Sequence, residues 1–169
     1  MDGSVLLLIV TNVLVVLALF LQGRLVDMMA VYGIQSLVIG ASYFVRILSL
    51  QKFSTENFKI DGRTVEPTPE TKVKVAVFFA FHFGIFHLVY FTFMFSGEYG
   101  EPKFGFDLAI CALAFVANHA FSFSYHRERD RAGSPNIGKL MFTPYVRIIP
   151  VRLTIIVGSF LPGALGVFV

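Results

Sequence analysis

The chain has 169 residues, of which 56% are hydrophobic and 15% charged, and its mean hydropathy is +0.73. A soluble domain carries about 25% charged residues and could not hide so much apolar surface at this length, so the composition excludes an ordinary soluble protein. The single cysteine, Cys111, excludes an internal disulfide and a finger-type thiolate zinc cluster, and the net charge of +3 fits lipid headgroups and membrane topology better than nucleic acid.

The apolar runs along the chain predict an all-α fold, a polytopic bundle of about five transmembrane helices in a single domain. About 20 apolar residues cross the hydrocarbon core of a bilayer, and several stretches nearly free of charge reach this length. We therefore expect an integral protein of the inner or plasma membrane, with the lipid bilayer as its main partner. The predicted spans are residues 4–23, 27–48, 73–96, 106–127 and 144–168.

The first and last spans need separate arguments. Residues 4–23 could be mistaken for a signal peptide, but Asp2 is the only early charge, so the basic segment is missing and we expect a retained helix. The last helix is predicted to begin near Pro144, because Thr143 offers a capping hydroxyl before a proline at the first helical position. Pro150 should kink this helix.

The loops between the predicted spans differ in charge. Five spans place the amino terminus and the two basic loops on one side, so the positive-inside bias predicts a cytoplasmic amino terminus and a carboxyl terminus outside. The basic residues on that side are Lys52, Lys59, Arg63, Lys72, Lys74, Arg127, Arg129, Arg131 and Lys139, against Arg24 and Lys103 on the other.

Polar residues inside the predicted spans form two stripes. His119, Ser122 and His126 have i, i+3, i+7 spacing and share a helix face, which Asp130 continues. A second stripe on another helix comprises Gln35, Ser42 and Arg46. Polar stripes on apolar helices point into a bundle, and ionisable groups at membrane depth mark function.

Depth along the helices selects the candidate centre. A rise of 1.5 Å per residue places His82 and His119 both roughly 12–15 Å below the cytoplasmic edge, where they could meet. Arg147 and Arg152 descend from the same edge and bracket this level. Histidine is the commonest metal ligand, so we predict a zinc site at His82 and His119, with the two arginines as further catalytic residues.

Two histidines do not complete a catalytic zinc site, which takes three protein ligands. His126 and Asp130 are the further candidate ligands, because their i, i+4 spacing lets two side chains reach one metal. His87, Glu128 or a partner subunit are the other sources of a ligand. Since five helices form a thin bundle, we also expect a homo-oligomer that shields the polar site.

Three short patterns resemble a family of small polytopic prokaryotic membrane proteins, a domain of unknown function. They are HFGIF with His82, NHAFSF with His119 and PYVRIIPVRLTIIVGSF with Arg147, in the family's order (H-F/Y-G-x-F, H-x-x-S-F and P-Y-x-R-I). The resemblance supports these three residues as site residues and implies no reaction. The family pattern has a histidine where this chain has Arg152, which would remove a possible third metal ligand.

Three functions remain open at this point. The first is a membrane-embedded zinc metalloenzyme, hydrolytic on a lipidic or anionic substrate that Arg147 or Arg152 would hold. The second is a small transporter or channel whose polar stripes line a path. The third is a haem b protein with His82 and His119 as axial ligands. Against all three stands the plain reading that the histidines only hold helices together by hydrogen bonds.

Overall fold

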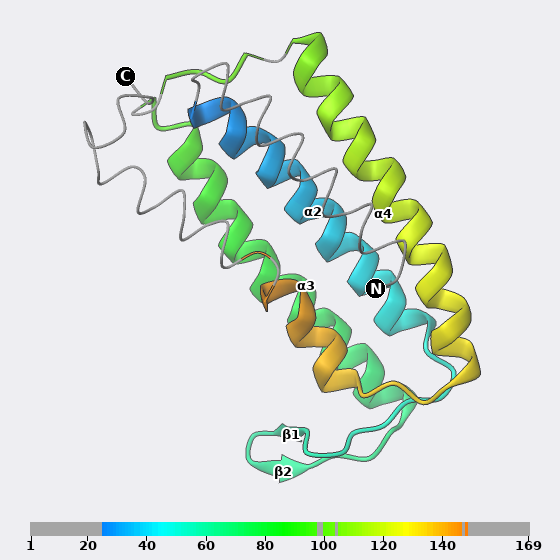
Figure 1. Ribbon diagram of the computed structural model, residues 1–169. Helices are drawn as coiled ribbons and strands as arrows, with labels where there is room; N and C mark the ends of the chain where they lie inside the picture. Colours follow the sequence, from blue (N-terminus) through cyan, green and yellow to red (C-terminus); the bar gives the residue numbers. More distant parts are fainter. Residues whose placement is uncertain (1–24, 98–99, 104, 147, 149–169) are drawn as a thin grey trace.

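The structure is a computed structural model, and it describes residues 25–97, 100–103, 105–146 and 148. Its long helices are α2 (Leu25–Ser49), α3 (Pro69–Met94) and α4 (Phe106–Ala132), and residues 137–146 are also helical. The three long helices lie side by side, with α2 and α4 running in the same direction and α3 in the opposite one (Figure 1). The described part is therefore an all-α bundle.

The three long helices are each long and apolar enough to cross a membrane. They correspond to the predicted spans 27–48, 73–96 and 106–127, so the membrane class of the prediction is confirmed. Among the described residues the helices number four, which supports a count of about four rather than the predicted five. The predicted span 4–23 and most of 144–168 lie outside the described residues.

Local sequence signals explain where α3 begins. The Thr68 hydroxyl accepts a hydrogen bond from the Thr71 backbone N–H at 3.2 Å, which caps the helix. Pro69 follows at the first helical position, where its missing N–H costs nothing, and Glu70 places a negative charge in the first turn. The Thr-Pro-Glu sequence thus sets the start of α3.

A small hairpin precedes α3. Strand β1 (Lys59–Ile60) pairs antiparallel with β2 (Arg63–Thr64), with Lys59 opposite Thr64 and Ile60 opposite Arg63. Asp61 and Gly62 form the turn with φ values of 52° and 75°. A two-residue turn of this kind needs positive φ at both positions, which is why the Asp-Gly pair stands here.

The helix after α4 begins earlier than predicted. It starts at residue 137 and runs through Thr143 and Pro144, where the sequence had indicated a start. The true cap is Asn136, whose side-chain oxygen accepts a hydrogen bond from the Lys139 backbone N–H at 3.0 Å. The Thr143 hydroxyl instead donates back to the Lys139 carbonyl at 2.6 Å, as threonine does inside a helix.

Helix α2 is the centre of the bundle. Its backbone lies close to those of both α3 and α4, whereas the backbones of α3 and α4 do not approach each other within the described residues. Gly33 and Gly40 allow the close approach of α3, since a Cβ at either position would overlap aromatic rings of that helix. At Gly40 the ring is that of Phe83. Small residues at a helix crossing are the usual means of tight packing in membranes.

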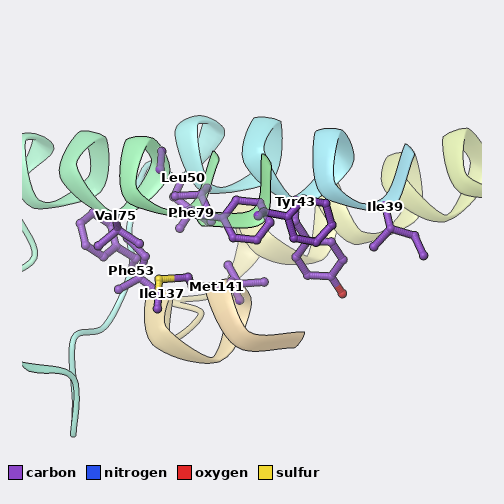
Figure 2. Close-up of a cluster of buried hydrophobic side chains, with 12 residues drawn as sticks. Ile39, Tyr43, Leu50, Phe53, Val75, Phe79, Ile137 and Met141 are labelled. Carbon is purple, nitrogen blue, oxygen red and sulfur yellow. The ribbon is translucent and has the colours of Figure 1, made fainter. Parts of the chain in front are cut away.

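Two apolar clusters hold the bundle at its two ends. One joins the second half of α2 to α3 and to the helix at 137–146, and Figure 2 shows its core residues Ile39, Tyr43, Leu50, Phe53, Val75, Phe79, Ile137 and Met141. The other joins the start of α2 to the end of α3 and the first half of α4 through Val26, Met29, Ala30, Val31, Met94, Leu108 and Phe115. The large apolar side chains facing outward on α3 are suited to lipid.

We expect Gly40→Ala to destabilise the bundle by about 1–3 kcal/mol, because the added methyl group overpacks against Phe83. Gly84→Ala is the matched control, since no atom lies within 4 Å of a Cβ placed there. Unfolding of the purified protein in mixed SDS micelles measures both. Equal stability of the two variants would contradict the close packing of α2 on α3.

Candidate functional site

Two chain segments meet at one end of the bundle, which we call the loop end: residues 50–68 and residues 133–136. Backbone hydrogen bonds join Ser54 N–H to the Pro135 carbonyl and Ile137 N–H to the Ser54 carbonyl, both at 3.0 Å. The Asn136 side-chain amide also donates to the Glu56 carbonyl at 2.8 Å. The hairpin loop therefore fixes the turn that connects α4 to the last described helix (Figure 1).

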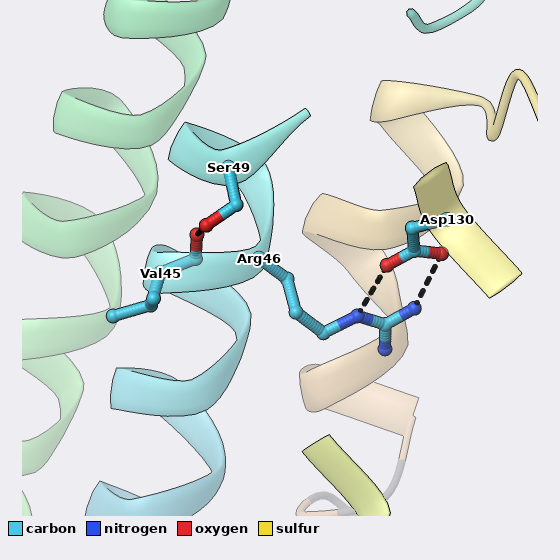
Figure 3. A network of polar contacts seen from close by, with 4 residues as sticks. All are labelled: Val45, Arg46, Ser49 and Asp130. Atoms are coloured by element: carbon cyan, nitrogen blue, oxygen red, sulfur yellow. Dashed lines mark hydrogen bonds and ion pairs between the residues drawn. The ribbon is translucent and has the colours of Figure 1, made fainter. Parts of the chain in front are cut away.

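An ion pair between α2 and α4 lies just inside the loop end. The Arg46 guanidinium donates from Nε and Nη2 to the two Asp130 carboxylate oxygens, at 2.8 Å and 3.0 Å (Figure 3). The two side chains are only 8% and 13% exposed. The guanidinium also lies 4.9 Å from the centre of the Tyr43 ring. A bidentate, largely buried pair of this geometry is the strong form of a salt bridge.

A cleft of about 440 Å³ opens beside this ion pair. Its walls come from the ends of α2 and α4, the turn at 133–136 and the helix at 137–146. The lining residues are Arg46, His126, Arg129, Asp130, Gly133, Ser134, Pro135, Asn136, Lys139, Leu140 and Thr143. The cleft thus combines several cationic side chains with neutral hydrogen-bonding groups.

The charges in the cleft favour an anion. Arg46, Arg129 and Lys139 are opposed by the single carboxylate of Asp130, which leaves a net positive lining. Asp130 engages Nε and Nη2 of Arg46, and no hydrogen bond to another described residue occupies Nη1. A guanidinium that one carboxylate holds in place still has an N–H donor for a second anionic group. This arrangement suits the recognition of a phosphate or a carboxylate.

His82 lies on the outside of α3. Its Nδ1 makes a 2.8 Å hydrogen bond with the Tyr145 hydroxyl, and its ring stacks on Phe78 at a centroid distance of 5.4 Å. His119 lies on α4 and is only 4% exposed. Because α2 lies between the two helices that carry them, the described structure does not bring His82 and His119 together.

The other predicted ligands lie elsewhere. His126 and Asp130 both line the cleft, as their i, i+4 spacing predicted, but Asp130 uses both oxygens on Arg46. Arg147 and Arg152 lie outside the residues whose side chains are described. Within the described residues, no three His, Cys, Asp or Glu side chains gather as a metal site would require. The zinc site and the haem site remain predictions.

His87 makes a connection that the sequence did not single out. Its Nε2 meets the Ser36 hydroxyl of α2 at 2.5 Å and its Nδ1 meets the Phe83 carbonyl at 2.7 Å. Because a carbonyl can only accept, Nδ1 donates to Phe83. The imidazole is 3% exposed and joins α3 to α2 in the interior.

One wall of the cleft, formed by Asn136, Lys139 and Thr143, was not predicted from the sequence. Their i, i+3, i+7 spacing would have placed them on one helix face, had the helix start been recognised at residue 137. Arg46 and Asp130 were each predicted to lie on polar faces, but nothing in the sequence paired them.

A family model matches residues 2–168, which is nearly the full length. The chain belongs to the family of unknown function DUF6498. This confirms the resemblance seen in the three motifs. Comparison with curated proteins and with solved structures found no match.

In this DUF6498 chain we expect Asp130→Asn to destabilise the fold by about 3 kcal/mol, because it leaves the buried Arg46 charge without its partner. Lys74→Gln is the control, since it breaks the exposed ion pair between Glu70 and Lys74 and should leave the melting temperature unchanged. Thermal unfolding in detergent measures both. A similar melting temperature for the two variants would show that the inner pair does not hold α4.

Proposed function

We propose that this membrane protein binds a phosphate-bearing headgroup in the cleft at its loop end. One observation carries the proposal: Asp130 holds the Arg46 guanidinium in the wall of a cleft to which Arg129 and Lys139 add positive charge. Charge-assisted hydrogen bonds from arginine and lysine are the main means of phosphate recognition in proteins.

The position of the cleft favours a lipid as the source of the phosphate. Arg46 lies in the last turn of α2, and Asp130 near the end of α4, so the cleft lies where two candidate spans end. Headgroups of a leaflet occupy this level, next to the hydrocarbon core. A free phosphate compound would offer the same chemistry, and the experiment below separates the two sources.

We infer that the loop end faces the cytoplasm. The hairpin, the start of α3 and the end of α4 all lie at this end, and they carry most of the basic residues of the chain. The positive-inside rule then assigns this end to the cytoplasmic side, with the anionic lipids of that leaflet within reach of the cleft.

Lys139→Ala should weaken the binding of phosphatidic acid roughly ten- to a hundredfold, the effect of losing one charge-assisted contact of about 1.5–3 kcal/mol. Native mass spectrometry of the purified protein in detergent measures the binding, with diacylglycerol as the phosphate-free lipid. Arg63→Ala is the matched control, because it removes one positive charge from the same end outside the cleft.

The outcomes separate the possible sources. Displacement of phosphatidic acid by millimolar inorganic phosphate would assign the cleft to a soluble phosphate compound, and its absence would assign the cleft to the lipid. Equal weakening by Arg63→Ala and Lys139→Ala would contradict the proposal, because it would mean that the lipid is attracted by the net charge of this end alone.

A zinc-dependent hydrolysis of the same lipid is the second candidate. The observation that favours it is that His126 and Asp130, two of the predicted ligands, line the cleft proposed for the headgroup. Zinc held there would activate a water next to the bound phosphate. A further ligand would come from the residues that the structure does not describe or from a second subunit of the predicted homo-oligomer.

Elemental analysis of the purified protein tests the metal. We expect about one zinc per chain, lost in His126→Ala and kept in His82→Ala, because His82 lies on the outer side of α3 away from the cleft. Metal-free native protein, or zinc that survives His126→Ala, would remove the cleft as a zinc site. The headgroup proposal does not depend on this result.

A further inference from the structure

The two predicted polar stripes face each other across one helix pair. Arg46 and Asp130, which form the ion pair between α2 and α4, are 84 residues apart in the sequence. Because the two helices are parallel and rise equally per residue, the same offset applies along their length. It places Ser42 level with His126 and Gln35 level with His119.

The apolar cluster at the far end agrees with this register. The 84-residue offset pairs Val31 with Phe115, and both of these side chains are fully buried within one cluster. The polar seam is therefore defined by seven residues, Gln35, Ser42 and Arg46 from α2 and His119, Ser122, His126 and Asp130 from α4. It begins at the cleft, which Arg46, His126 and Asp130 line.

The polar seam reaches far into the membrane-spanning part. Eleven residues separate Gln35 from Arg46, which corresponds to about 16 Å along the helix, or roughly half the hydrocarbon thickness. Gln35 and His119 at its inner end are 7% and 4% exposed. Beyond them Val31 and Phe115 belong to the apolar cluster, which separates the polar seam from Asp27, a buried carboxylate at the start of α2 that accepts a hydrogen bond from the Lys103 backbone N–H.

A neighbouring amide indicates what the inner end of the polar seam contains. Asn118 is 6% exposed, and neither its oxygen nor its nitrogen has a hydrogen-bond partner in the part of the chain that the structure describes. It precedes His119 on α4 and shares a face with Phe115 and Ser122. A buried amide without a protein partner is costly, and internal water is its usual partner.

We propose that water reaches His119 from the loop end along the polar seam, and that the apolar cluster closes the path on the other side. The ionisable groups along the path are His119, His126, Asp130 and Arg46. The path would give a buried site one-sided access to water, whichever ligand the cleft binds.

Single thiols test the path in proteoliposomes of the full-length protein, in a Cys111→Ala background that removes the native cysteine. Ag⁺, an ion of about the size of a water molecule, is added in chloride-free buffer to one side of the membrane. After SDS denaturation, a maleimide labels the thiols that Ag⁺ has not reached. Glu56→Cys marks the loop end, and Glu101→Cys, which follows α3, marks the other end.

We expect Ser42→Cys and Ser122→Cys to be protected by Ag⁺ from the side that protects Glu56→Cys, with at least tenfold less protection from the opposite side. Leu113→Cys, which replaces an outward-facing side chain on α4, and Phe115→Cys within the apolar cluster should stay unprotected from both sides. Seam thiols that Ag⁺ does not reach, or reaches from the Glu101 side, would overturn the proposal.

Discussion

The ion pair between Arg46 and Asp130 fixes how α4 lies on the rest of the bundle. Helix α3 is held to α2 by ring packing at Gly33 and Gly40 and by the bond between Ser36 and His87. The backbone of helix α4 does not approach that of α3 among the described residues, so α2 is its main packing partner. Apolar packing holds its first half, and the ion pair holds its second half.

The ion pair between Arg46 and Asp130 has a physical role other than stabilising the fold. Removing two charges from water costs free energy that their attraction need not repay, so such a pair is weak evidence of a more stable fold. In a membrane the apolar faces of two helices can slide past each other with little loss, because lipid is as apolar as the helix. A bidentate guanidinium–carboxylate pair permits one register, and that register aligns the polar residues of α2 and α4.

The sequence predicted the helices well and their neighbours poorly. Apolar run lengths located α2, α3 and α4, and the predicted polar face of α2 agrees with the burial of Gln35 and Arg46. The meeting of His82 with His119 rested on the assumption that helices adjacent in sequence pack together. Here α2 lies between them, with Gly33 and Gly40 allowing the close approach of α3 and the ion pair between Arg46 and Asp130 joining α2 to α4. No pattern within a single sequence shows which helix the other helices will pack against.

Asn136 gives the loop end a mechanical property. One side-chain atom of this residue holds the backbone of the hairpin loop at Glu56, and another caps the helix that carries Lys139. The Phe58 ring presses on the same helix at Gly138, so the contact is backed by packing. Because Asn136 bonds to both elements, a displacement of the hairpin, for example by adsorption onto a charged surface, would also displace the helix that forms one wall of the cleft.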